Sequence, residues 1–400
     1  MIGVPLVIPS FIPSFPHSFI ISPITLIFMA KMAKGFLLQL LRSVDRISSR
    51  FSRQVKALLG YKPNWPVMVA TYRGYGRKER AYLKGRVLKD RRIIARNVNS
   101  RWRALINNYK RFSSREIGGA TVGVRIGDNE MQLITDEEGY FQFDGNLSVP
   151  LPDRGDPWRE AHIRVTATPQ RQVDVQATGS LLIPPPIAEF GVISDVDDTV
   201  LQTDVTSLLK LRVLYHTLLK SAALRRSFGQ AAAFFQALHW GNHEQSGNPV
   251  FYVSNSPWNL YDLLEEFLSL NGLPNGPILL RDFGIPYQEH PGNYKGHKHS
   301  SIVRILNTYP ELPFILIGDS GEKDAYIYWA VAQEFPGRIA ATYIRDVRSG
   351  RRARRIARFI EKTGADIQMV QDYTQAAGDA ARRGLIQLEI FEQFRKERLL

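Results

Sequence analysis

After residue 187, three short apolar segments each lead straight into polar residues, and this arrangement restricts the possible folds more than any other feature. The segments are residues 188–194, 250–253 and 314–317. Short, nearly continuous apolar runs are typical of strands in a parallel sheet that is covered by helices on both faces. Open sheets of this kind bind ligands beyond the carboxyl ends of their strands. We therefore expect an α/β domain over residues 188–384, with polar residues gathered at one edge of its sheet.

Two carboxylates follow the first segment, in the run Asp-Val-Asp-Asp-Thr-Val of residues 195–200. A pair spaced by two residues in the loop that leaves a buried strand suits phosphoryl transfer. Asp195 can attack phosphorus in line and become an acyl phosphate. Asp197 can protonate the leaving oxygen and then activate the water that hydrolyses this intermediate. An Asp-x-Asp pair is also common on protein surfaces, so the pair alone does not establish a catalytic site.

Polar residues also follow the other two segments. Ser254 can hydrogen-bond a phosphoryl oxygen, although by itself it is equally well a residue at the start of the helix expected from Trp258. The third segment leads to Asp319 and Asp324, and their hard oxygen ligands, in blocks without His or Cys, favour Mg²⁺ over zinc. Lys298, at the start of another expected helix, can neutralise both the nucleophile and a bound phosphate. A single lysine is far more often a surface residue.

In this order the four segments resemble the haloacid dehalogenase (HAD) superfamily of phosphotransferases. Its pattern is an Asp-x-Asp-x-Thr block, a strand ending in Ser or Thr, a Lys, and a Gly-Asp-x-x-x-x-Asp block. The closer resemblance is to phosphatidate phosphatases of the yeast actin patch protein type. It is carried by residues 194–200, 251–258 (Phe-Tyr-Val-Ser-Asn-Ser-Pro-Trp), 297–298 (His-Lys) and 317–321 (Ile-Gly-Asp-Ser-Gly), and it covers about residues 190–350.

The resemblance implies a Rossmann-like parallel sheet of the HAD type with a helical cap insert. It also implies Mg²⁺-dependent hydrolysis of phosphatidate to diacylglycerol and phosphate through an aspartyl-phosphate intermediate. Carried over position by position, it makes Asp195 the nucleophile and Asp197 the acid and base. The phosphate-binding residues are then Ser254, Asn255 and Lys298, and the metal ligands Asp195, Asp197, Asp319 and Asp324.

Residues 64–187 are rich in short strands separated by turn residues, which predicts a β-sandwich. Residues 136–139 (Asp-Glu-Glu-Gly) are expected to form a turn before an aromatic strand. The glycines of Tyr72-Arg73-Gly74-Tyr75-Gly76 favour a tight turn over a phosphate cradle. Residues 184–186, three consecutive prolines, are expected to be a stiff spacer that closes the domain.

Residues 201–249 show helical periodicity directly after the nucleophile, where the resemblance places a cap over the active site. Apolar residues at helical spacing, here including Phe234, Phe235 and Leu238, more often belong to an ordinary core, and we favour that interpretation. Residues 385–400 are expected to form a C-terminal helical tail. The paired arginines of residues 351–355 predict a solvated helix face.

The basic residues are concentrated in the N-terminal part. Residues 1–115 carry 23 Lys and Arg against three acidic residues, a net charge of +20, whereas the rest of the chain has a net charge of −6. Residues 34–62 form a basic amphipathic pattern that suits a membrane interface as well as a helix packed on its own protein. We expect an anionic membrane surface as partner and a cytoplasmic, peripherally membrane-associated enzyme. No nucleic-acid partner is expected, because no recognised motif accompanies the basic residues.

Residues 1–33 are an apolar, proline-rich leader. Prolines interrupt it at Pro5, Pro9, Pro13, Pro16 and Pro23, which disfavours a spanning helix. The first lysine follows the apolar run, unlike in a secretory signal. A targeting or insertion segment is the less favoured alternative to a mis-assigned start, with translation beginning at Met29 or Met32.

Two other functions stay open as alternatives. A non-catalytic phosphatidate-binding module would keep this fold without the nucleophile, and the presence of both Asp195 and Asp197 counts against it. A phosphomonoesterase of soluble substrates would have no obvious use for the basic N-terminal part.

Overall fold

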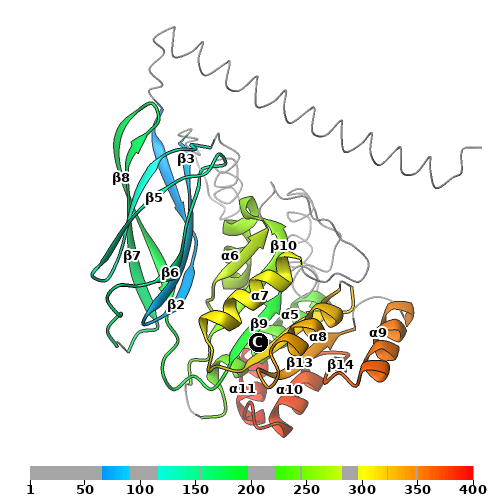
Figure 1. The fold of residues 1–400 in the computed structure, drawn as a ribbon. Coiled ribbons are helices and arrows are strands. Elements are labelled where there is room, and N and C mark those ends of the chain that lie inside the picture. Colours follow the sequence, from blue (N-terminus) through cyan, green and yellow to red (C-terminus); the bar gives the residue numbers. More distant parts are fainter. Residues whose placement is uncertain are drawn as a thin grey trace, which may run out of the picture. The chain divides into compact units, whose positions relative to one another are not determined.

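The computed structural model describes residues 65–90, 116–153, 155–196, 222–243, 246–281, 296–321, 323–346 and 350–399 (Figure 1). Residues 65–400 belong to one compact unit. The predicted leader over residues 1–33 and the predicted amphipathic helix over residues 34–62 lie outside the described residues. No helix in the described ranges is long and apolar enough to cross a membrane.

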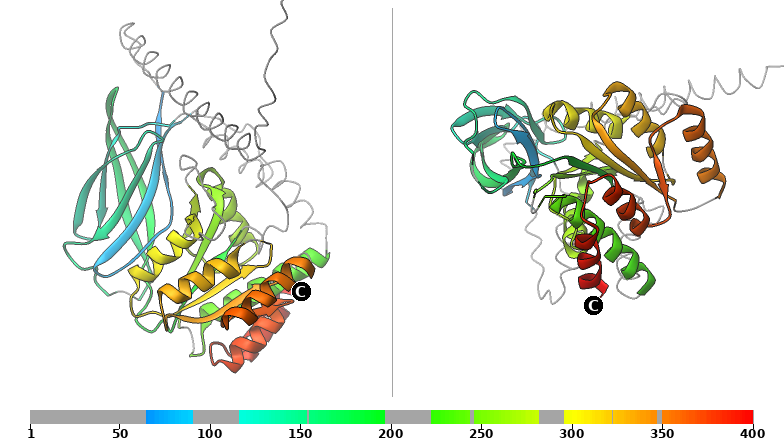
Figure 2. Two further views of the ribbon diagram at one scale, coloured as in Figure 1. Left: turned by 45° about the vertical axis from the view of Figure 1, so that its right-hand side comes forward. Right: turned by 90° about the horizontal axis from the view of Figure 1, so that it is seen from below.

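The described part of residues 65–183 is built from short strands, as predicted for residues 64–187. They are β1 (Val67–Thr71), β2 (Gly74–Arg77), β3 (Arg80–Lys89), β4 (Thr121–Ile126), β5 (Asn129–Ile134), β6 (Tyr140–Asn146), β7 (Trp158–Thr168) and β8 (Arg171–Leu182). They form one eight-stranded sheet in the order β1-β3-β2-β8-β7-β4-β5, with β6 paired to β3. All pairs are antiparallel except β2 with β8. Seen from below, the strands curve around a common interior (Figure 2).

This single sheet differs from the two separate sheets of the predicted sandwich. The reason is the length of β3, which has ten residues. One edge of β3 pairs with β1 and β2 in succession, and the other edge pairs with β6. Along β7, Ala161, Ile163 and Val165 are buried, whereas the residues between them are exposed, so one face of the sheet forms the core.

Turns were predicted at two glycine-containing segments of this sheet, and the structure confirms one of them. The predicted turn at residues 136–139 is confirmed: Gly139 has φ +81° and its N–H donates to the Asp136 carbonyl over 3.0 Å. The turn predicted at Gly74 and Gly76 is wrong, because both lie in β2. A Cβ atom on Gly74 would lie 2.3 Å from the Tyr82 carbonyl oxygen, so glycine here permits a close approach of neighbouring strands.

The expected α/β domain with a parallel sheet is confirmed. Its strands are β9 (Gly191–Asp195), β10 (Val250–Pro257), β11 (Ile278–Arg281), β12 (Phe314–Asp319), β13 (Ile339–Arg345) and β14 (Gln368–Val370). All are parallel, in the order β11-β10-β9-β12-β13-β14. The chain adds strands to one side of β9 and then continues on the other side with β12. The strand order therefore reverses between β9 and β12, where sheets of this topology bind ligands.

Helices cover both faces of this sheet because its strands are apolar on both sides (Figure 2). Val192 belongs to the core that includes residues of α5 (Ala222–Trp240), α6 (Tyr261–Leu270), α10 (Tyr373–Arg382) and α11 (Leu388–Leu399). The next residue, Ile193, belongs to the core that includes residues of α7 (His297–Thr308), α8 (Asp324–Glu334) and α9 (Gly350–Thr363).

The described half of the predicted cap insert is a core helix. In α5, Phe234, Phe235 and Leu238 are buried in the sheet core, as the favoured interpretation predicted. Residues 201–221 lie outside the described residues. The predicted C-terminal helix is present as α11, and Phe391 is fully buried in the same core. This helix is thus part of the α/β core and not a separate tail.

Candidate active site

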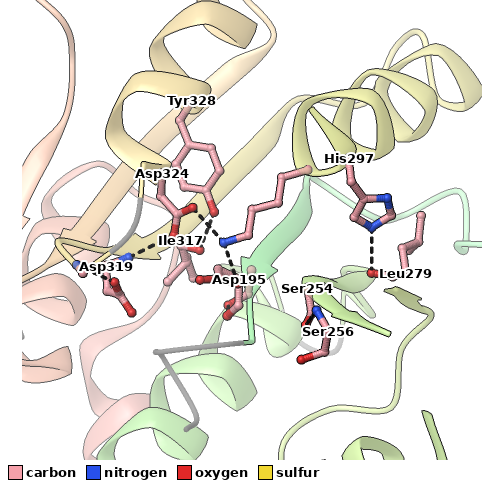
Figure 3. Close-up of polar contacts among 12 residues, drawn as sticks. Asp195, Ser254, Ser256, Leu279, His297, Ile317, Asp319, Asp324 and Tyr328 are labelled. Atoms are coloured by element: carbon pink, nitrogen blue, oxygen red, sulfur yellow. Dashed lines mark hydrogen bonds and ion pairs between the residues drawn. The ribbon is translucent and has the colours of Figure 1, made fainter. Parts of the chain in front are cut away.

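Asp195 and Asp319 end the two neighbouring strands at the point where the strand order reverses. Asp195 is the last residue of β9 and Asp319 the last residue of β12. The exposed fractions of the two residues are 1% and 0%. Both carboxylates lie at the carboxyl edge of the sheet, where the sequence predicted them (Figure 3). Asp197, their expected partner, lies outside the described residues.

Lys298 joins two of the predicted site carboxylates. It lies in the first turn of α7 and is 2% exposed. Its Nζ lies 2.9 Å from Oδ1 of Asp195 and 3.0 Å from Oδ1 of Asp324 (Figure 3). Buried charges persist when they are paired and hydrogen-bonded. The lysine is therefore an internal cation between two carboxylates and not a surface residue.

Asp324 links this ion pair to the end of β12. It begins α8, where a carboxylate interacts favourably with the helix dipole. One carboxylate oxygen contacts Lys298, and the other, Oδ2, accepts the backbone N–H of Asp319 over 3.3 Å. Gly318 makes this approach possible, since a Cβ atom there would lie 2.5 Å from Asp324 Oδ2.

The loop after β12 is held by hydrogen bonds to neighbouring elements. Asp319 Oδ1 accepts the N–H of Gly321 over 2.7 Å. The N–H of Ser320 donates to the Arg345 carbonyl over 2.8 Å, and its hydroxyl donates to Asp346 over 3.1 Å. These bonds fix the direction in which the Asp319 carboxylate leaves the sheet.

Ser254 and Asn255 lie on β10, next to Asp195. Val253 pairs with Asp195 across the two strands, so Ser254 is one residue beyond the partner of Asp195. Ser254 is fully buried and Asn255 is half-buried. The hydroxyl of Ser254 accepts the N–H of Ser256 over 2.9 Å, which stabilises the turn into the 3₁₀ helix at Trp258–Leu260. The sequence-predicted phosphate-binding residues therefore share the sheet edge with Asp195.

Tyr328 is a site residue that sequence reasoning missed. Its hydroxyl donates to the Ile317 carbonyl over 2.9 Å, close to Asp324 (Figure 3). Burial, and then the nearby charge of Asp324, raises the pKa of this phenol well above its ordinary value. The phenol therefore stays protonated and acts as a donor. The available signal was its spacing of four residues from Asp324, which puts both on one face of α8.

The donors in this region are suited to a hard cation. Within the described residues no group of three or more His, Cys, Asp or Glu side chains is arranged to hold a metal ion. Mg²⁺ commonly uses only one or two carboxylates, together with waters and substrate phosphate. The carboxylates of Asp195 and Asp319, on adjacent strands and without a sulfur or imidazole donor, fit that requirement.

Comparison with known proteins supports the same region as a catalytic domain. Residues 190–346 match the family model described as the catalytic domain of phosphatidate phosphatase APP1. Phosphatidate phosphatase APP1 of Saccharomyces cerevisiae is 33% identical over 157 residues, which cover 39% of this chain and 26% of that protein. An uncharacterized protein of Schizosaccharomyces pombe is 28% identical over 224 residues, which cover 55% of this chain and 35% of that protein.

The chain thus spans about a quarter to a third of the length of these relatives. Among solved structures, a carbohydrate acetylesterase from Xanthomonas citri aligns over 69% of this chain and 66% of that chain, with 9% identity and a TM-score of 0.25. A likeness this weak carries no information about function. The family match confirms the resemblance drawn from the motifs: residues 190–346 are similar to the catalytic domain of APP1-type phosphatidate phosphatases.

Proposed function

We propose that this chain is a phosphatidate phosphatase that hydrolyses phosphatidate to diacylglycerol and phosphate through a covalent intermediate on Asp195. The similarity of residues 190–346 to the APP1 catalytic domain supports this substrate class. The observation that carries the chemistry is the buried carboxylate of Asp195, at the reversal of strand order, 2.9 Å from the Lys298 ammonium. A phosphate is negatively charged and repels an attacking carboxylate. A cation fixed beside the buried carboxylate offsets this repulsion, so the arrangement suits attack on phosphorus.

In the first step an oxygen of Asp195 attacks phosphorus and forms a new P–O bond. The bond from phosphorus to the diacylglycerol oxygen breaks, and that oxygen takes a proton from Asp197. Lys298 orients the attacking carboxylate and offers positive charge to the phosphoryl oxygens as the transition state forms. The role of Asp197 rests on its place in the sequence motif, because it lies outside the described residues.

In the second step water attacks the phosphorus of the phosphoaspartate, and Asp197 accepts a proton from that water. The bond between phosphorus and the Asp195 oxygen breaks, which releases inorganic phosphate and restores the carboxylate. Ser254 and Asn255, on the strand beside β9, are the residues that we assign to the phosphoryl oxygens. Asp324 keeps Lys298 in place through the contact of 3.0 Å.

We propose that the enzyme requires Mg²⁺, with oxygen ligands from Asp195, Asp197 and Asp319 and a further carboxylate in Asp324. When bound, the ion supplies positive charge to the phosphoryl group. The acidic residues support this proposal, because Lys298 neutralises only one of the buried charges of Asp195, Asp319 and Asp324. With these ligands, the site would combine a HAD-type mechanism with a lipid substrate.

The substrate also implies a place of action. Phosphatidate is a bilayer lipid, so we propose a cytoplasmic enzyme that associates peripherally with anionic membrane surfaces. The net charge of +20 over residues 1–115 supports this, although most of that part lies outside the described residues.

A substrate panel tests the proposed function. Phosphate release is measured from phosphatidate in mixed micelles and from a set of water-soluble phosphomonoesters, each with Mg²⁺ and with chelator. We expect Mg²⁺-dependent release from phosphatidate in strong preference to the soluble esters. Preference for a soluble ester would identify a soluble phosphomonoesterase. Binding of phosphatidate without any phosphate release would identify a non-catalytic lipid-binding module.

A further inference from the structure

Helix α9 presents an exposed row of cations. The sequence predicted a solvated face here, and the structure shows Ile356 as the buried residue of this helix. Arg351, Arg355, Arg358 and Lys362 are exposed and recur at spacings of four, three and four residues. Residues at this spacing lie on one line along a helix. We refer to these four residues as the α9 basic row.

The opposite side of α9 is used for packing within the protein. Phe359 contacts the rings of Tyr326 and Trp329 on α8, with centroid distances of 4.7 and 5.5 Å. Ile356 and Ile360 belong to the same core as α8. The apolar side of α9 is therefore covered, and its outward side is the one that carries the cations.

The α9 basic row lacks acidic partners in the described part of the chain. No ion pair joins any of its four side chains to a carboxylate of a described residue. By contrast, Arg382, the cation at the end of α10, is paired with Asp379 over 3.0 Å. Glu361 is the one acidic residue of α9, against five arginines and one lysine. The helix therefore keeps an excess of positive charge, and its local potential favours an anionic surface.

The N-terminal end of α9, where the row begins, lies near the candidate active site. Helix α9 begins at Gly350, shortly after β13 ends at the carboxyl edge of the sheet (Figure 1). Arg352, next to the row, donates from Nη1 to the Gly321 carbonyl over 2.5 Å. The N–H of Gly321 in turn donates to the carboxylate of Asp319. The first turn of α9 is thus attached to the loop that directly follows Asp319.

We propose that the α9 basic row docks this edge of the α/β domain on an anionic phospholipid bilayer. Because the apolar side of α9 is packed on α8, the contact is made by cations with lipid headgroups and not by insertion into the acyl layer. This proposal rests on the proposed function and deepens it. Docking here would bring the strand ends towards the membrane surface in which phosphatidate lies. It concerns residues distinct from the N-terminal basic region.

Vesicle binding by the full chain tests this surface. The probe is phosphatidylcholine vesicles with and without phosphatidylserine, so that no phosphatidate is present. The variant Arg351→Gln, Arg355→Gln, Arg358→Gln is expected to bind phosphatidylserine vesicles at least about tenfold more weakly than the unaltered chain at about 0.1 M salt. A matched variant removes the same charge from exposed sites elsewhere, through Arg125→Gln, Arg382→Gln and Lys396→Gln. It should bind as tightly as the unaltered chain.

Activity provides the second readout. Hydrolysis of a monomeric short-chain phosphatidate should be equal in both variants, whereas hydrolysis of phosphatidate in vesicles should fall only in the α9 variant. If the unaltered chain hydrolyses neither substrate, the proposed function fails, while vesicle binding still decides whether the row docks. Equal vesicle binding by the two variants would overturn the docking proposal. The docking proposal would also be overturned if the α9 variant lost binding to RNA but kept its affinity for vesicles.

Discussion

Replacement of Lys298 by methionine is expected to destabilise the folded protein strongly. The lysine is 2% exposed and contacts Asp195 over 2.9 Å and Asp324 over 3.0 Å. Methionine has a similar length and helix propensity, so the substitution removes mainly the charge. The two carboxylates then stay buried without their cation.

Breaking a buried ion pair from one side costs about 3–5 kcal/mol, because an uncompensated charge is left in a medium of low polarity. We expect Lys298→Met to lower the free energy of unfolding by this amount near neutral pH. Part of the loss should be recovered when Asp324→Asn is added, because the double variant leaves one fewer unpaired carboxylate. The double variant should therefore be less destabilised than the sum of the two single variants.

Equilibrium urea unfolding, followed by circular dichroism, measures these free energies. Lys396→Met is the matched control, because Lys396 is exposed on α11 and its replacement should change the free energy of unfolding by no more than about 0.5 kcal/mol. A loss below about 1 kcal/mol for Lys298→Met, or strict additivity with Asp324→Asn, would refute the buried charge network.

Three further outcomes are expected from the same contacts. Gly318→Ala should cost about 2 kcal/mol in urea unfolding, because its Cβ would lie 2.5 Å from Asp324 Oδ2, whereas Gly350→Ala, with no atom within 4 Å, should be nearly neutral; equal effects would contradict this. Burial, with two glutamates of α6 nearby, raises the pKa of Asp262 from 3.8 to about 7, so the folded state retains a proton that the unfolded state loses as the pH rises between these values. Asp262→Asn should therefore be more stable than the unaltered chain by about 2 kcal/mol at about pH 8, with no difference near pH 4, and a gain that is the same at both values would be inconsistent with this. Mg²⁺ should raise the melting temperature of the unaltered chain and not that of Asp319→Asn; an equal rise in both would remove Asp319 from the proposed ligands.

Much of the α/β domain was predictable because its signals are local. Residues 188–194, 250–253 and 314–317 predicted strands, and β9, β10 and β12 lie there. Strands that are buried on both faces need apolar residues at nearly every position, so such runs are visible without any periodicity. The gathering of Asp195, Ser254 and Asp319 at one edge follows from the parallel direction of the strands.

Other features depend on contacts between residues far apart in the chain. The two apparent turn glycines, Gly74 and Gly76, lie in a strand because of neighbours in β3, which no local pattern reveals. The single curved sheet results from the pairing of one long strand with three others. The burial of Lys298 depends on how α7 crosses the sheet, so composition alone favoured a surface position.

Helix periodicity also left one ambiguity that only packing resolves. A cap and a core helix both need apolar residues at spacings of three and four. Phe234 and Phe235 belong to the core because α5 lies between β9 and β10 in the chain and covers one sheet face.

The role of Asp195 as nucleophile is tested by the rate of phosphatidate hydrolysis, with Mg²⁺ present, by the Asp195→Asn variant. Asparagine keeps the shape of the side chain but lacks the charged oxygen that attacks phosphorus. We predict a fall in kcat of at least about a thousandfold, roughly 4 kcal/mol of activation free energy, with the variant still folded by circular dichroism. A folded Asp195→Asn variant that hydrolyses phosphatidate at a near-normal rate would contradict the covalent mechanism.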